Sequence, residues 1–128
     1  MDVMHRKILV VDDDPDAVEL LRFTLKQAGF RVGTAENGVT ALRKACSLYP
    51  DLILLDLMMP ELDGFAVCET LRLDPATASI PIILLTAASS EFVRLTGLDS
   101  GATEYMTKPF SPRALIGRVT ELLRHASD

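Results

Sequence analysis

Five short apolar runs mark the chain, and a segment with helical periodicity follows each of them. The runs are typical of strands because they are rich in aliphatic and β-branched residues and are bounded by turn-forming residues. They lie within residues 7–11, 30–36, 51–56, 80–87 and 102–110. The helical segments span residues 16–29, 37–49, 65–73, 90–101 and 111–127. This alternation predicts an α/β domain with a parallel sheet of five strands, five helices and right-handed crossovers.

Apolar positions also predict which surfaces are buried. The runs at 52–55 and 82–85 show no polar alternation, which indicates strands covered by helices on both sides. In the second helical segment, spacing predicts one buried face formed by Val39, Leu42, Ala45 and Cys46.

Composition narrows the class of protein. The 128 residues are 48% hydrophobic and 24% charged, which fits a single domain over residues 1–128. A net charge of −5 argues against direct nucleic-acid binding by this domain. No apolar run approaches the roughly 18 residues of a membrane span. Cys46 and Cys68 are far apart, so we expect buried free thiols and a reducing, cytoplasmic location.

The candidate chemistry collects where the strands end. Asp12 and Asp13 follow the first strand, Asp56 ends the third, Thr86 ends the fourth, and Lys108 follows the fifth. The carboxyl ends of parallel strands meet at one edge of the sheet, where ligands bind. Helix caps could explain one acid at a time but not readily the whole set.

Clustered carboxylates favour a bound cation, and hard oxygen ligands suit Mg²⁺. An aspartate beside such an ion can accept a phosphoryl group covalently, and Asp56 is the best placed nucleophile. The sequence has no GxxxxGK[ST], GxGxxG or GxSxG motif, so it lacks the usual nucleotide and hydrolase signatures. A donor protein or a small phosphodonor would therefore supply the phosphoryl group.

Four blocks in order, ILVVDDDP, LILLDLMMPELDG, IILLTA and GLDSGATEYMTKPFSP, resemble the response-regulator receiver domain of two-component signalling. The resemblance covers about residues 6–125. It implies a flavodoxin-like, doubly wound sheet in the order 2-1-3-4-5. It also implies a signalling switch rather than an enzyme acting on a separate substrate, although the domain would catalyse its own phosphorylation and autodephosphorylation.

The resemblance implies a role for each site residue. Asp56 matches the phosphoacceptor and a metal ligand, Asp13 a direct Mg²⁺ ligand, and Asp12 a ligand acting through water. The backbone carbonyl of Met58 matches the third protein ligand, and Mn²⁺ is a substitute ion. Lys108, in a cis bond to Pro109, matches the phosphate-binding lysine.

The resemblance also implies how the switch works and which partners it has. Thr86 matches the hydroxyl that turns toward the phosphoryl group, and Tyr105 the aromatic residue that follows it. A sensor histidine kinase or a phosphotransfer protein would donate, and an effector domain or target protein would respond. A phosphorylation-dependent homodimer could use Arg94, Glu104 and Arg118, although simple solvated charges explain them equally well.

Two other functions stay open at this point. A Mg²⁺-dependent phosphohydrolase with an aspartyl nucleophile would usually carry a second acid at the position of Met58, together with larger insertions. A receiver-like binding module without phosphorylation would not need the complete set of site residues.

Overall fold

The computed structural model describes residues 5–87 and 90–127, and within these ranges five parallel strands form one sheet in the order β2-β1-β3-β4-β5. This order confirms the predicted topology. The strands are β1 (Lys7–Val11), β2 (Arg31–Ala35), β3 (Leu52–Asp56), β4 (Ile82–Thr86) and β5 (Glu104–Thr107). Because β1 lies between β2 and β3, the chain reverses its direction of winding at the β1–β3 boundary, where open α/β sheets bind ligands.

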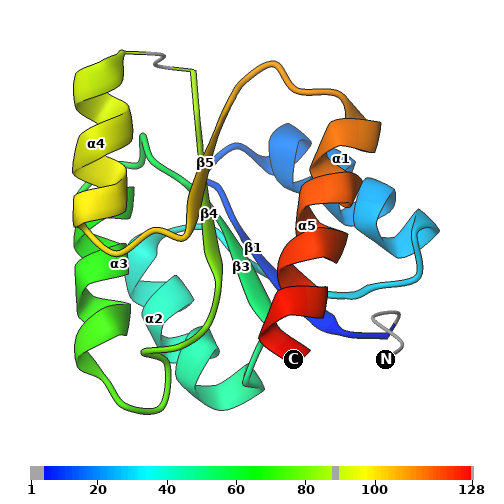
Figure 1. Cartoon of the computed structure of the whole chain (residues 1–128), viewed down its shortest axis with the longest axis horizontal. Helices are drawn as coiled ribbons and strands as arrows, with labels where there is room; N and C mark the ends of the chain where they lie inside the picture. Colours follow the sequence, from blue (N-terminus) through cyan, green and yellow to red (C-terminus); the bar gives the residue numbers. More distant parts are fainter. Residues whose placement is uncertain (1–4, 88–89, 128) are drawn as a thin grey trace.

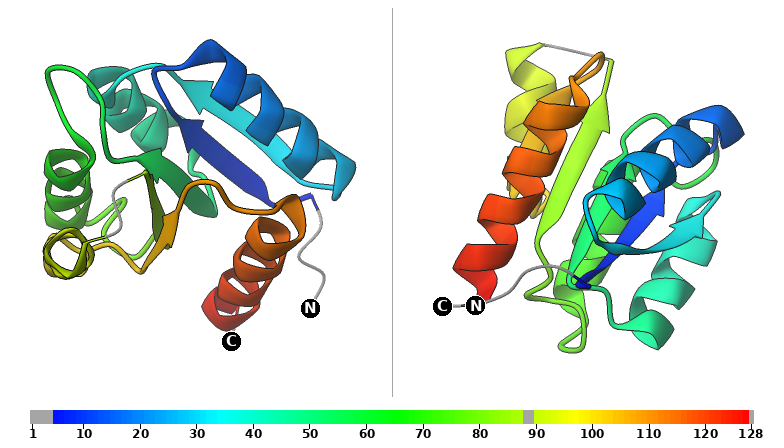
Figure 2. Two further views of the ribbon diagram at one scale, coloured as in Figure 1. Left: turned by 90° about the horizontal axis from the view of Figure 1, so that it is seen from above. Right: turned by 90° about the vertical axis from the view of Figure 1, so that its right-hand side faces the viewer.

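Helices cover both faces of the sheet (Figure 1). One face carries α1 (Pro15–Gln27) and α5 (Pro112–Ser127), and the other carries α2 (Gly38–Leu48), α3 (Gly64–Leu73) and α4 (Glu91–Asp99). Figure 2 shows this layering from above and from the side, with the sheet twisted between the two helical layers. None of the helices among the described residues is long and apolar enough to cross a membrane.

Two hydrophobic clusters hold the layers together. Along β1, Leu9 and Val11 belong to the cluster beneath α2 and α3, whereas Ile8 and Val10 belong to the cluster beneath α1 and α5. Successive side chains of a strand point to opposite faces, so a strand inside a doubly covered sheet must be apolar at every position. This explains the uninterrupted apolar runs of β3 and β4.

Side chains at the helix starts fix the loops near the strand ends. Asp14 caps α1, since its carboxylate accepts a hydrogen bond from the Asp16 amide and Pro15 begins the helix. Asp63 caps α3 in the same way, because its carboxylate accepts a hydrogen bond from the Ala66 amide. Ser111 accepts from the Ala114 amide at the start of α5.

The predicted buried face of α2 is wrong at two positions. Val39 is 63% exposed and the side chain of Cys46 is also exposed, whereas Gly38, Ala41 and Ala45 face the core. The true face is rotated because α2 packs through its smallest residues, which let the helix backbone approach its neighbours closely. The expectation of a buried thiol is therefore right for Cys68 and wrong for Cys46.

Candidate functional site

Strand register brings three acids together at the carboxyl edge of the sheet. Val11 of β1 pairs with Leu55 of β3, so Asp12, which follows β1, lies beside Asp56 at the end of β3. One carboxylate oxygen from each of Asp12, Asp13 and Asp56 lies within 4.8 Å of the others. The three carboxylates thus form one cluster, although they come from opposite ends of a 45-residue stretch of sequence from position 12 to position 56.

The three acids differ in their exposure to water. Asp12 is 1% exposed and Asp56 is 6% exposed, whereas Asp13 lies on the surface. The Oδ1 atom of Asp12 accepts a hydrogen bond of 3.0 Å from the Asp14 amide. The cluster therefore has a buried floor and one carboxylate that faces solvent.

Lys108 supplies the cation of this cluster. Its Nζ atom lies 3.1 Å from Asp12 Oδ2 and 3.5 Å from Asp56 Oδ1. The Lys108 amide donates a 2.7 Å hydrogen bond to the Thr86 carbonyl, which ties the end of β5 to the end of β4. The Lys108–Pro109 peptide bond is cis, as predicted.

Burial and neighbouring charge shift the pKa values of this cluster. Burial, and then the negative charge of Asp12, raises the pKa of Asp56 from 3.8 to about 6, against the opposing effects of Lys108 and a backbone hydrogen bond from Met58. Burial lowers the pKa of Lys108, but the carboxylates of Asp12 and Asp56 outweigh it and leave the pKa raised. At neutral pH, Asp56 is therefore mainly an ionised carboxylate beside a charged ammonium.

The donor set fits a hard divalent cation. Three carboxylates face one ammonium group, so negative charge is in excess, and all the clustered acidic atoms are oxygens. Mg²⁺ prefers oxygen ligands and keeps several of its waters, which the exposed side of Asp13 leaves room for. The residues present therefore fit a Mg²⁺ ion, with Mn²⁺ as a chemically similar substitute.

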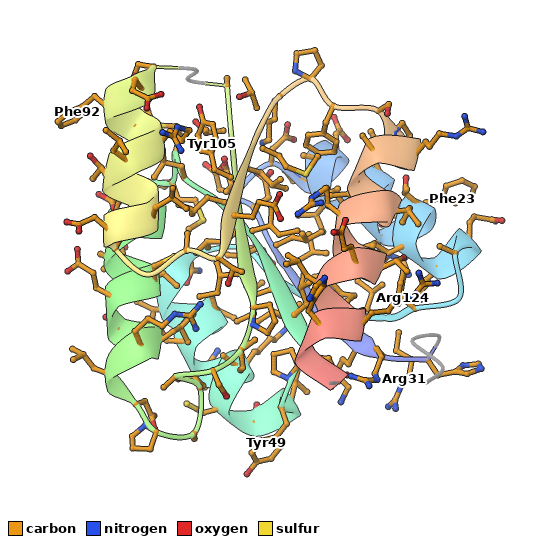
Figure 3. The ribbon with its side chains drawn as sticks, in the orientation of Figure 1. Phe23, Arg31, Tyr49, Phe92, Tyr105 and Arg124 are labelled. Atoms are coloured by element: carbon orange, nitrogen blue, oxygen red, sulfur yellow. The ribbon has the colours of Figure 1, made fainter. Side chains whose placement is uncertain are left out.

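The other predicted site residues, Thr86, Met58 and Tyr105, differ in their burial and in the element that carries them. Thr86 is the last residue of β4 and is fully buried at the same sheet edge. Met58 is 68% exposed, while its backbone amide donates a hydrogen bond to the Asp56 carboxylate. Tyr105 is half-buried on β5 and lies toward α4 in Figure 3, where it lines a hollow with Arg94 and Arg118.

Charges on the α4–β5–α5 side have partners within this chain. Arg118 contacts Glu104 at 2.6 Å through Nη2 and Glu121 at 2.7 Å through Nη1. Arg94 pairs with Glu91 one helical turn away. Pairing of these residues across a dimer, one of the two alternatives left open by the sequence, would therefore compete with ion pairs that already exist in one molecule.

An apolar groove beside the acidic cluster was not predicted from the sequence. It has a volume of about 360 Å³ and lies between α1 and the segment joining β5 to α5. Its walls include Leu20, Leu21, Pro109 and Phe110, and Lys108 also borders it. The two walls are nearly 90 residues apart in the chain, so only the folded arrangement reveals the groove.

Comparison with known proteins gives one family. The model of the response regulator receiver domain family matches residues 8–120. The chain is 49% identical over 123 residues to the alkaline phosphatase synthesis transcriptional regulatory protein PhoP of Bacillus subtilis, covering 96% of this chain and 50% of that protein. It is 44% identical to the DNA-binding response regulator MtrA of Mycolicibacterium smegmatis, covering 100% and 55% respectively.

Solved structures agree with the sequence relatives. A response regulator of Chloroflexus aurantiacus superposes with a TM-score of 0.89 at 35% identity, covering 93% of this chain and 98% of that one. The receiver domain of a histidine kinase of Syntrophus aciditrophicus gives a TM-score of 0.87 at 37% identity, covering 94% and 91%. The chain spans about half the length of the curated relatives it matches. With its fold and its sequence relatives in agreement, the chain belongs to the response regulator receiver domain family.

Proposed function

We propose that this domain is a phosphorylation switch in which Asp56 accepts a phosphoryl group from a phosphohistidine. The proposal rests on one observation above all: Asp56 is a buried carboxylate held between Lys108 and two further acids. A receiver-like module without phosphorylation would carry the cost of burying these charges without using them. Residues 1–128 would form one receiver domain with a core of about 6–125.

Four groups of this chain would hold Mg²⁺. These are the carboxylates of Asp13 and Asp56, the Met58 backbone carbonyl, and Asp12 acting through water. When bound, the ion offsets the negative charge of the carboxylates and of the incoming phosphoryl oxygens. Lys108 would provide a second positive charge beside Asp56, which is supported by the 3.5 Å distance between its Nζ atom and that carboxylate.

The chemical step is an in-line displacement at phosphorus. An oxygen of the ionised Asp56 carboxylate forms the new P–O bond, and the P–N bond to the donor imidazole breaks. The electron pair of that bond stays on the imidazole nitrogen. If the other ring nitrogen carries no proton, solvent supplies one and the donor leaves as neutral imidazole. The product is an acyl phosphate on Asp56, and hydrolysis by water, which restores the carboxylate and releases inorganic phosphate, resets the switch.

The new charge would be read out through Thr86 and Tyr105. An aspartyl phosphate carries acceptor oxygens that attract the Thr86 hydroxyl and the Lys108 ammonium. Movement of Thr86 would leave space into which Tyr105, half-buried on the neighbouring strand β5, could move. The α4–β5–α5 surface would then repack and alter its binding of an effector domain, of a target protein or of a second copy.

The apolar groove between α1 and the β5–α5 segment is our proposed contact for the donor. A histidine kinase or phosphotransfer protein must bring its phosphohistidine to Asp56, and Lys108 borders both the groove and the acid cluster. Leu20 on the rim is well exposed, and Phe23, one turn further along α1, projects outward in Figure 3. Such partners meet the domain in the cytoplasm, where the exposed thiol of Cys46 would stay reduced.

Intact mass spectrometry tests the proposal. Wild-type protein treated with acetyl phosphate and Mg²⁺ should gain about 80 Da, the mass of one phosphoryl group, and Asp56→Ala should gain nothing. Phosphoryl transfer from a purified phosphohistidine protein should label the same residue. Absence of any adduct with every donor would overturn the switch, and steady turnover of an added phosphoester would instead indicate a phosphohydrolase.

A further inference from the structure

We infer that Gly38, at the start of α2, is a positioning residue that sets the place of the loop connecting β3 to α3. This loop, residues 57–63, carries Met58, so the inference deepens the proposed metal site and rests on it. Gly38 touches none of the reacting groups. It would act through Leu62, against which it packs.

The contact between Gly38 and Leu62 leaves no space for a side chain. A methyl group on residue 38 would lie 2.9 Å from both Leu62 Cδ2 and the Leu62 carbonyl oxygen, and 3.0 Å from Leu62 Cβ. Carbon atoms pack comfortably at about 3.5–4.0 Å, so these distances require movement. A side-chain carbon could rotate away, but the carbonyl oxygen moves only if the loop backbone moves with it.

The rest of the loop is held too firmly to absorb that movement locally. The Gly64 amide donates to the Leu57 carbonyl at 3.0 Å, and the Leu62 amide donates to the Pro60 carbonyl at 2.8 Å. Met59 is buried in the core, and Glu61 has a positive φ of 68°. A shift of Leu62 would therefore pass along the backbone to Met58.

Met58 is where such a shift would matter. Its backbone bonds to Asp56, and its carbonyl is the proposed third ligand of Mg²⁺. Mg²⁺ demands nearly ideal octahedral geometry with ligands at about 2.0–2.1 Å, so displacement of one ligand by a few tenths of an ångström weakens binding. Removal of support for a metal ligand commonly costs about tenfold or more in affinity.

The chain offers a matched control. Gly117 is also a helical glycine, and a methyl group there would meet nothing within 4 Å. Gly38→Ala and Gly117→Ala therefore make the same chemical change, but only the first meets the metal-binding loop. Calorimetric titration with Mg²⁺ should give a Kd raised about tenfold in Gly38→Ala and unchanged in Gly117→Ala.

A second readout needs no metal. In metal-free protein, Gly38→Ala should speed hydrogen exchange at the backbone amides within residues 57–62 and leave β1 unchanged, while Gly117→Ala should not speed exchange in this loop. Hydrogen exchange tests the positioning of the loop independently of the proposed metal site. If wild-type protein fails to bind Mg²⁺, the proposed metal site is wrong, whereas the positioning of the loop is still decided by exchange.

Leu62→Ala approaches the same contact from the loop side and serves if Gly38→Ala does not fold. Loss of the Leu62 side chain should loosen the loop, raise the Kd for Mg²⁺ and speed exchange at residues 57–62. A folded Gly38→Ala with wild-type Kd and wild-type exchange overturns the inference. So does an unaltered Leu62→Ala if the glycine variant cannot be obtained.

Discussion

The Lys108 ammonium lies 3.1 Å from the Oδ2 atom of Asp12, a residue 96 positions earlier in the chain. Asp12 is almost completely buried, and its other oxygen accepts from the Asp14 amide. Loss of one partner from a buried ion pair leaves the other charge without compensation. Lys108 should therefore stabilise the metal-free domain in addition to its proposed role in catalysis.

Lys108→Met should lower the free energy of unfolding of metal-free protein by about 1–2 kcal/mol at pH 7. The expected loss is smaller than for a fully buried pair because the Lys108 side chain is 30% exposed. Urea unfolding in the presence of EDTA measures it. Lys26→Met, which removes an exposed lysine from the last turn of α1, is the control and should change stability much less. Equal effects of the two changes would show that the Asp12 pair contributes nothing.

The raised pKa of Asp56 predicts a particular dependence of stability on pH. In the folded protein this pKa is about 6, against an ordinary value of 3.8, so the folded state binds the proton more tightly. The stability associated with protonated Asp56 is fully present below about pH 4 and is lost as the pH rises through about 6. A shift of this size corresponds to roughly 2–3 kcal/mol.

Asp56→Asn isolates this contribution because its side chain cannot titrate. In EDTA, the free energy of unfolding of Asp56→Asn minus that of wild type should increase between pH 4 and pH 7. Urea titrations at several pH values provide the comparison. A difference that stays constant over this range would contradict a raised pKa for Asp56.

Mg²⁺ should stabilise the protein, and Asp13 should be required for the effect. For a Kd of about 1 mM, roughly 10 mM Mg²⁺ adds about 1.4 kcal/mol, which raises the Tm by roughly 5 °C for a domain of this size. Because Asp13 is exposed, Asp13→Asn should leave the metal-free Tm nearly unchanged and remove the Mg²⁺ effect. Glu69→Gln, at an exposed acid on α3, should respond to Mg²⁺ like wild type. A full Mg²⁺ response in Asp13→Asn would exclude Asp13 as a ligand.

Sequence patterns predicted most of the fold because burial dictates them. Strands covered on both sides must be apolar throughout, which marks β3 and β4 in the sequence. The carboxyl ends of parallel strands meet at one sheet edge, so the positions of Asp12, Asp56 and Lys108 relative to their strands are enough to predict that these residues lie together. The rotation of α2 was not predictable from apolar spacing, because the face that packs is formed by Gly38 and Ala41 rather than by larger residues.

Hydrogen bonds from side chains to backbone groups distant in the chain could not be predicted from the sequence either. The Arg72 guanidinium donates to the carbonyls of Ala78, Ile80 and Gly101, joining the end of α3 to the segments before β4 and β5. An arginine near the end of a helix looks like an ordinary solvated charge, and nothing in its sequence neighbours marks these acceptors.

Two glycines, Gly64 and Gly117, should respond to alanine substitution in opposite directions. A methyl group on Gly64 would lie 2.9 Å from the Leu57 Cα atom and 3.0 Å from the Asp56 carbonyl oxygen, so Gly64→Ala must push α3 away from the end of β3. Overpacking of this kind costs about 1–3 kcal/mol. Gly117→Ala meets no neighbour and should add about 0.5–1 kcal/mol, because alanine restricts the unfolded chain and favours helix. Urea unfolding should therefore give free energies on either side of wild type. If Gly64→Ala were stabilised like Gly117→Ala, helix propensity rather than close packing would determine the effect at Gly64.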